Sequence, residues 1–137
     1  YERMIVEKRR HLQPQTDDAI SYDACQTAHQ LDAGLIVAFT ESGSTAGRVS
    51  KYRPKPPVLA LTPHAAVQRR LTLSWGVSPV TVSSPRSVED IFAQGVQQAL
   101  ENRCAEPLDL LVLVAGVPIG VPGGTNLLRV MTIPAPK

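Results

Sequence analysis

The sequence lacks long hydrophobic runs, has only two cysteines and carries almost no net charge. Its longest apolar stretches, Leu35–Phe39 and Leu110–Val117, are far shorter than the roughly 20 residues that a membrane-spanning helix needs. Fourteen basic and twelve acidic side chains leave a charge of +2, which argues against nucleic-acid binding. Cys25 and Cys104 lie far apart in the chain, so we predict free thiols in a reducing, cytoplasmic compartment rather than a disulfide scaffold.

The common catalytic and cofactor-binding motifs are missing too. The sequence has no GxSxG, HExxH or CxxC motif, no P-loop and no GxGxxG fingerprint. Its histidines (His11, His29 and His64) stand alone, and a lone helical histidine is usually a surface or packing residue. We therefore expect no metal site and no catalytic residues in this chain.

What the sequence does contain is an alternation of helical and extended patterns. Apolar residues at helical spacing predict a helix from Thr16 to Leu31 and another from Ser87 to Leu100. Shorter helices are expected around Ala46–Tyr52 and from Thr62-Pro63, as cap and first turn, to Leu71 or Leu73. Strands are predicted at Leu35–Phe39, Val58–Leu61, Val77–Val82, Leu110–Ala115 and Leu127–Ile133.

This order of elements predicts an α/β fold with a five-stranded, mostly parallel sheet flanked by helices. Helices between successive strands imply right-handed crossovers and parallel pairing. The last two strands have no helix between them, so the final strand should be antiparallel. Pro79 cannot donate to a ladder, and this places Val77–Val82 at an edge of the sheet.

The loop Thr40–Thr45 is the first candidate binding site. It joins a buried strand to a helix start, where free backbone N–H groups bind phosphate, and Gly43 lets the backbone approach a ligand. Ser42, Ser44 and Thr45 add hydroxyl donors. The alternative, which composition alone favours, is that Ser44 is only a helix cap among turn-forming residues.

The loop Gly116–Asn126, rich in glycine and proline, is the second candidate. Ligands of open α/β sheets gather at the carboxyl ends of strands where the strand order reverses, so both loops share one crevice if the first and fourth strands are neighbours. The alternative is a stiff connection without a ligand. The basic run Arg48, Lys51, Arg53 and Lys55 is either a solvated helix face or an attraction for an anionic ligand.

Short motifs follow one another along about residues 16 to 133 of the chain. They are Thr40–Ala46, Val49–Pro54, Leu61-Thr62-Pro63, Trp75-Gly76-Val77, Pro79, Ala115–Pro118, Gly120 and Gly124–Asn126. In these motifs and their order the sequence resembles the C-terminal domain of pyruvate kinases, the bacterial members above all.

The resemblance implies a three-layer α/β sandwich with an allosteric pocket for a phosphorylated sugar or nucleotide. The pocket residues carried over are Thr40, Ser42, Gly43, Ser44 and Thr45, and the cover loop is Gly116, Val117, Pro118, Gly120, Gly123, Gly124 and Thr125. Two departures of this sequence from the family's pattern point to a monophosphate effector, or to no effector. Glu41 stands where members that bind a sugar bisphosphate tend to have lysine, and Ser87–Gly95 lacks their tryptophan and arginine.

The resemblance also implies that the chemistry lies elsewhere. In pyruvate kinases a separate barrel, which holds magnesium and potassium, transfers the phosphoryl group from phosphoenolpyruvate to ADP. We expect residues 1–14 to be a remnant of the helix that joins this barrel, and residues 15–137 to be a regulatory domain that assembles into homo-oligomers through its last strand. The alternatives are a free-standing phosphometabolite-binding module of the same fold and a small enzyme acting in the same crevice.

Overall fold

The computed structural model describes residues 16–116 and 125–136. In these residues helices and strands alternate until the last two strands, as the sequence patterns predict. The order is α2 (Thr16–Gln30), β1 (Leu35–Phe39), α3 (Ser44–Lys51), β2 (Val58–Thr62), α4 (Ala65–Leu71), β3 (Val77–Thr81), α5 (Val88–Glu101), β4 (Leu110–Ala115) and β5 (Leu127–Thr132).

The strands form one sheet in the order β3-β2-β1-β4-β5. β1 pairs in parallel with β2 and β4, and β2 pairs in parallel with β3. β5 runs antiparallel to β4, with Leu110 opposite Thr132. The predicted α/β class, the parallel sheet and the antiparallel last strand are confirmed. β3 lies at an edge, as Pro79 required.

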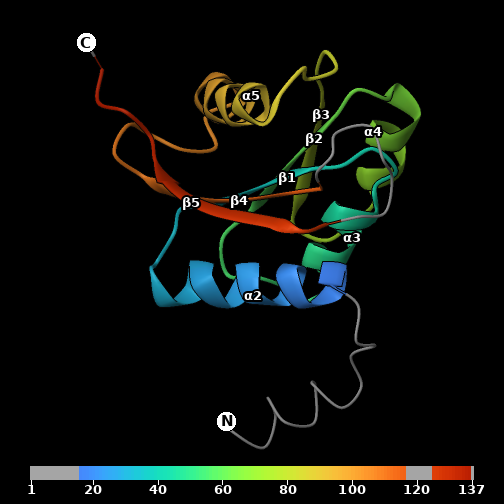
Figure 1. Cartoon of the computed structure of the whole chain (residues 1–137), viewed down its shortest axis with the longest axis horizontal. Coiled ribbons are helices and arrows are strands. Elements are labelled where there is room, and N and C mark those ends of the chain that lie inside the picture. Colours follow the sequence, from blue (N-terminus) through green and yellow to red (C-terminus); the bar gives the residue numbers. More distant parts are fainter. Residues whose placement is uncertain (1–15, 117–124, 137) are drawn as a thin grey trace, which may run out of the picture.

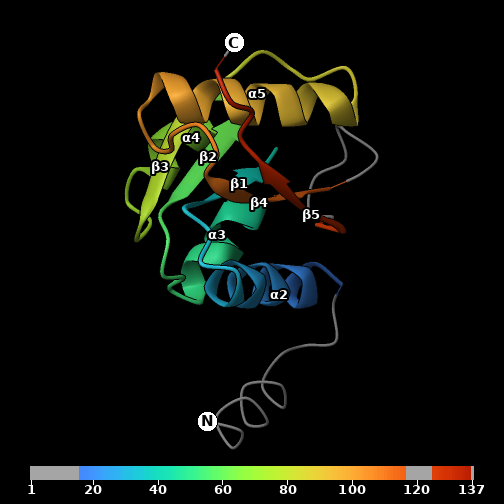
Figure 2. The same cartoon turned by 90° about the vertical axis from the view of Figure 1, so that its left-hand side faces the viewer.

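Helices cover both faces of the sheet, so the domain has three layers (Figure 1). α2 and α3 lie on one face and α5 on the other, and the view turned by 90° shows the same separation (Figure 2). β1 is central and all five of its residues are buried: Ile36 and Ala38 face the α2–α3 layer, whereas Leu35, Val37 and Phe39 face α5. A strand that is apolar on both faces fits this central position.

Local capping explains where α5 begins. The Asp90 backbone N–H donates to the Ser87 hydroxyl at 3.1 Å, so Ser87 is the N-cap, as predicted. Ile91, Phe92 and Ala99 are buried, but Leu100, which we expected in the same apolar stripe, is 40% exposed at the last turn. The buried stripe therefore ends at Ala99, earlier than the spacing of apolar residues predicts.

The predicted start of the third helix is wrong. Thr62 belongs to β2, where it pairs with Thr81, and α4 begins only after His64. The ladder with β3 holds Thr62 extended, and its hydroxyl accepts from the His64 backbone N–H at 3.3 Å. Pro63 therefore precedes the helix rather than opening its first turn.

Candidate functional site

The strand order reverses between β1 and β4, and the two candidate loops leave these strands at the same edge of the sheet. The hydroxyls of Thr45 and Thr125 lie 2.6 Å apart, although the two residues are separated by 80 positions. Both threonines are buried. The first and fourth strands are therefore neighbours, which is the condition for the two loops to share one crevice, and one described contact joins these loops.

The turn before α3 is built around Gly43, whose φ of 95° favours glycine. The Gly43 backbone N–H donates to the Thr40 hydroxyl at 2.8 Å. The Ser42 hydroxyl donates to that of Ser44 at 3.1 Å and accepts a longer bond, 3.4 Å, from the Ser44 backbone N–H. Thr40 thus holds the turn, while both serine side chains stay at the helix start.

The N-terminus of α3 has no side-chain cap, because its N-cap residue is Gly43. Among the described residues, none accepts a hydrogen bond from the backbone N–H groups of Thr45 and Ala46. These groups and the helix dipole make the first turn of α3 electropositive. The first turn contains no acidic residue to offset this charge.

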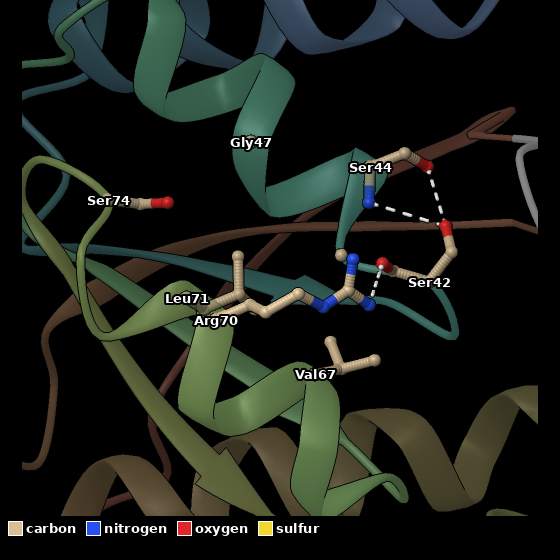
Figure 3. Close-up of a pocket in the computed structure, with 8 residues that line it drawn as sticks. Ser42, Ser44, Gly47, Val67, Arg70, Leu71 and Ser74 are labelled. Carbon is tan, nitrogen blue, oxygen red and sulfur yellow. Dashed lines mark hydrogen bonds between the residues drawn. The ribbon is translucent and has the colours of Figure 1, made fainter.

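A hollow of about 370 Å³ opens beside this first turn, between α3 and α4 (Figure 3). We call it the α3–α4 hollow. Gly43 is one of its lining residues, and a Cβ atom on this residue would lie 3.4 Å from Val67 Cγ1. The lining combines serine hydroxyls, two aliphatic side chains, two glycines and one guanidinium: Ser42, Gly43, Ser44, Gly47, Val67, Arg70, Leu71 and Ser74.

Arg70 supplies the positive charge of this hollow, and no sequence motif singles it out. Its Nη2 donates to the Ser42 carbonyl oxygen at 3.1 Å, and the side chain reaches across from α4 toward the start of α3 (Figure 3). No carboxylate of the described residues pairs with Arg70. The only sequence feature that could have pointed to Arg70 is its position in the last turn of a predicted helix. Arg69 has the same feature, so it does not distinguish the two arginines.

The predicted basic run, residues 48–55, contributes no side chain to the lining of this hollow. Arg48 pairs with Asp17 at 2.6 Å, and Lys51 donates to Asp18 at 3.3 Å, so both turn toward the first turn of α2. Partial burial lowers the pKa of Lys51, but its contacts with Asp18 and Tyr52 outweigh that effect and the pKa is raised.

The other two members of the run are occupied as well. Lys55 lies 3.6 Å from Asp32, and the Arg53 guanidinium lies over the Trp75 ring, 5.1 Å from its centroid. None of the four residues in these two contacts lines the hollow.

Glu41 is also engaged. Its carboxylate lies 2.8 Å from Nε2 of His64, the residue that precedes α4. The Glu41 side chain is 18% exposed, so this pair lies partly out of solvent. The contact orients the carboxylate toward α4, and a protonated imidazole would offset its negative charge.

The predicted pocket residues separate into two groups. Ser42, Gly43 and Ser44 line the hollow, whereas Thr40 and Thr45 are buried and do not line it. Of the predicted cover loop, Gly116 follows β4 and Thr125 contacts Thr45. The cover-loop residues Val117, Pro118, Gly120, Gly123 and Gly124 lie outside the described residues, as do residues 1–14 of the expected connecting helix.

The described part of the chain holds no metal-binding cluster, no disulfide and no helix that could span a membrane. No group of three or more histidine, cysteine or acidic side chains comes together there, so these residues do not fit a bound metal ion. Cys25 and Cys104 form no disulfide, and burial raises the pKa of the Cys104 thiol. None of the described helices is both long and apolar enough to cross a membrane.

Comparisons with known proteins agree with this fold. The family model for the pyruvate kinase alpha/beta domain matches residues 18–131. The chain is 41% identical over 133 residues to a pyruvate kinase of Clostridium acetobutylicum, covering 97% of the chain and 28% of that protein. It is 43% identical over 118 residues to pyruvate kinase 2 of Synechocystis, covering 86% of the chain and 20% of that protein. The crystal structure of Cryptosporidium parvum pyruvate kinase matches with a TM-score of 0.78 and 28% identity, over 90% of this chain and 23% of that one.

Proposed function

Because this chain belongs to the pyruvate kinase family and contains its α/β domain, we propose that it is a regulatory and assembly domain of a cytoplasmic pyruvate kinase. In this proposal the 40–45 loop binds the phosphate group of an effector. The chain spans between 20% and 28% of the length of the curated relatives named above. Transfer of the phosphoryl group from phosphoenolpyruvate to ADP, with its magnesium and potassium, is accordingly assigned to the barrel domain of a longer parent chain.

One observation carries the effector proposal: the uncapped first turn of α3 lies beside an arginine without a carboxylate partner among the described residues. The N–H groups of Thr45 and Ala46, the positive end of the helix dipole and the Arg70 guanidinium all favour an anion at the same place. A phosphate oxygen would replace the long bond between Ser42 and the Ser44 backbone N–H and gain a charge-assisted one.

A single phosphate suits this site better than two. Glu41 contributes a carboxylate to the loop, even though His64 holds it. Ser87–Gly95, at the start of α5, contains neither tryptophan nor arginine to bind a second phosphate group. Arg70 is the one cation that lines the hollow among the described residues.

The test is a titration of the isotope-labelled chain with inorganic phosphate, followed by amide NMR. We expect the backbone amides of Gly43–Ala46 to shift, and Ser44→Ala to weaken binding about threefold to tenfold because a charge-assisted hydrogen bond is lost. Glu41→Lys should strengthen binding, since it exchanges repulsion for attraction. Ser78→Ala, on the exposed edge strand β3, is the matched control and should change nothing.

Two results would contradict the proposal. One is the absence of amide shifts in the 40–46 segment at millimolar phosphate, which would leave this loop as a structural turn only. The other is saturable binding whose shifts lie wholly outside the segment and which Ser44→Ala leaves unchanged.

A further inference from the structure

Glu41 and His64 connect the turn before α3 to the start of α4. Glu41 directly precedes Ser42, and His64 is the N-cap residue of α4. The Glu41 carboxylate lies 2.8 Å from Nε2 of His64, although the two residues are 23 positions apart in the sequence. Histidine is the side chain that ordinarily gains or loses a charge between about pH 5 and 8. One side-chain pair with a pH-dependent net charge therefore lies beside the candidate anion site.

The two partners differ in their access to solvent. The His64 side chain is 54% exposed, so its ring can exchange protons with water, whereas the Glu41 side chain is only 18% exposed. His64 is the only ionic partner of Glu41 in the described part of the chain. The protonation of one imidazole thus decides whether the negative charge of this turn is offset.

The helices that follow β1, β2 and β3 carry the other charged side chains of this region. Arg70 of α4 donates to the Ser42 carbonyl oxygen, whereas Arg48 and Lys51 of α3 turn to the aspartates of α2. The remaining ones are Arg69 of α4 and, at the start of α5, Arg86, Glu89 and Asp90. None of these is a histidine, and residues 117–124 contain no titratable side chain, so His64 is the group here that ordinarily titrates near neutral pH.

We propose that the Glu41–His64 pair makes anion binding at the first turn of α3 depend on pH. A protonated His64 offsets the Glu41 carboxylate, and an anion then meets the electropositive helix start and Arg70 without opposing charge. When His64 loses its proton, an uncompensated carboxylate remains next to Ser42 and repels the anion. Binding is therefore tighter in acid than in base. This inference rests on the proposed phosphate site and adds how that site is regulated.

Sulfate is the probe for this test, because its charge is constant between about pH 5.5 and 8, whereas inorganic phosphate itself titrates in that range. Calorimetry on the 137-residue chain measures the affinity at both ends of the range, in cationic buffers of equal and low ionic strength. Amide NMR at the lower pH locates the bound anion. We expect shifts at Gly43–Ala46 and binding about threefold to tenfold tighter at the lower pH, the size expected for one charge several ångströms away.

Three variants assign the effect to the pair. His64→Gln removes the titrating ring and should abolish the pH dependence, with the affinity at both pH values close to that of the unchanged chain in base. Glu41→Gln removes the repelling charge and should bind sulfate in base about threefold to tenfold more tightly than the unchanged chain. His29→Gln is the matched control: His29 is exposed in the last turn of α2, and its loss should leave the full pH dependence.

The outcomes separate this inference from the proposal beneath it. If sulfate binds at Gly43–Ala46 equally well at both pH values, or if His64→Gln keeps the pH dependence, the regulation is overturned and the anion site stands. If His64→Gln weakens sulfate in base by more than about twofold, the imidazole contacts the anion itself and the pair is not the regulator. If sulfate shifts none of these amides and does not bind at either pH, both proposals fall.

Discussion

Gly43 and Gly47 are one helical turn apart at the start of α3, yet they differ in what their backbones require. Gly43 has a φ of 95°, which side chains with a Cβ atom rarely adopt, and it also packs closely against Val67. Gly47 has no positive φ and no close neighbour in the described residues. The first glycine is therefore needed for the fold, whereas the second leaves room beside the helix.

This difference predicts opposite effects of the same substitution. Gly43→Ala should lower the free energy of unfolding by about 1–2 kcal/mol because alanine is strained at positive φ. Gly47→Ala should raise it by about 0.5–1 kcal/mol because alanine is the better helix former and meets no clash. Urea unfolding followed by circular dichroism measures both values. A loss of stability in Gly47→Ala would show that the position has a packing role after all.

At the residue scale, the sequence predicted part of the candidate site. Ser42, Gly43 and Ser44 could be selected because a hydroxyl-rich turn between a buried strand and a helix is a local pattern. Arg70 could not be selected, since its reach to the Ser42 carbonyl depends on how α4 is offset against α3. The two interpretations of the basic run stayed open for the same reason: nothing local shows that Asp17 lies beside Arg48.

At the scale of elements, the ion pairs between α3 and α2 help to dock the first helix on the sheet. Arg48 lies between Asp17 and Asp18, at 2.6 and 3.5 Å, and the two aspartate side chains are only 13% exposed. The T-shaped packing of Tyr22 on Tyr52, with ring centroids 5.4 Å apart, joins the same two helices. The contact thus combines partly buried charge with aromatic packing.

Removal of Arg48 should therefore cost more than removal of an exposed cation. We expect Arg48→Ala to lower the free energy of unfolding by about 1–2 kcal/mol, because it leaves the partly buried Asp17 carboxylate without its cation and Asp18 with Lys51 alone. Lys55→Ala is the control: Lys55 and Asp32 are 71% and 88% exposed, so the change should stay below about 0.5 kcal/mol. Equal losses in the two variants, measured by urea unfolding, would mean that the α2–α3 pairs add nothing to stability.

The last strand is an open edge in the described structure. β5 pairs with β4 on one side, and Val130 is 38% exposed on it. Unpaired N–H and C=O groups along such an edge favour pairing with another chain. β3, the opposite edge, is protected by Pro79, which cannot donate a hydrogen bond.

Self-association through β5 should respond to charge on that strand. We expect sedimentation velocity to show a dimer at tens of micromolar chain, and Val130→Lys to shift it toward monomer. Ser78→Lys places the same charge on the exposed face of β3 and should leave the dimer unchanged. A strictly monomeric chain at that concentration, or equal effects of both lysines, would contradict assembly through β5.

The elements themselves were largely predictable, because central strands that are apolar on both faces and a capped amphipathic helix are local signals. Leu35–Phe39 and Leu110–Ala115 were predicted with the boundaries that the structure has. The start of α4 was not, since the β2–β3 ladder holds Thr62 extended against its preference as a helix cap. The predicted helix boundary was wrong where strand pairing between distant residues competed with local helix capping.

At the scale of the whole molecule, the chain spans between 20% and 28% of the length of the curated relatives named above, and our proposal assigns phosphoryl transfer to the barrel domain of a longer parent chain. On that proposal we expect the 137-residue chain to form no pyruvate from phosphoenolpyruvate and ADP in the presence of magnesium and potassium. A coupled assay of pyruvate against a buffer blank checks this, with a full-length pyruvate kinase as the positive control. Pyruvate above the blank would overturn the assignment of a purely regulatory domain.

The strand order also has a consequence for how the chain is made. β1 lies at the centre of the sheet, but one of its two neighbours, β4, follows α5 in the sequence. A ribosome adds roughly 5–20 residues per second. The edge of β1 that pairs with β4 therefore stays unpaired for several seconds after β2 has been synthesised. A nascent chain thus passes through an interval in which Leu35–Phe39 is open to aggregation and Thr45 still lacks Thr125, so a chaperone has its greatest opportunity to bind before the fourth strand is synthesised.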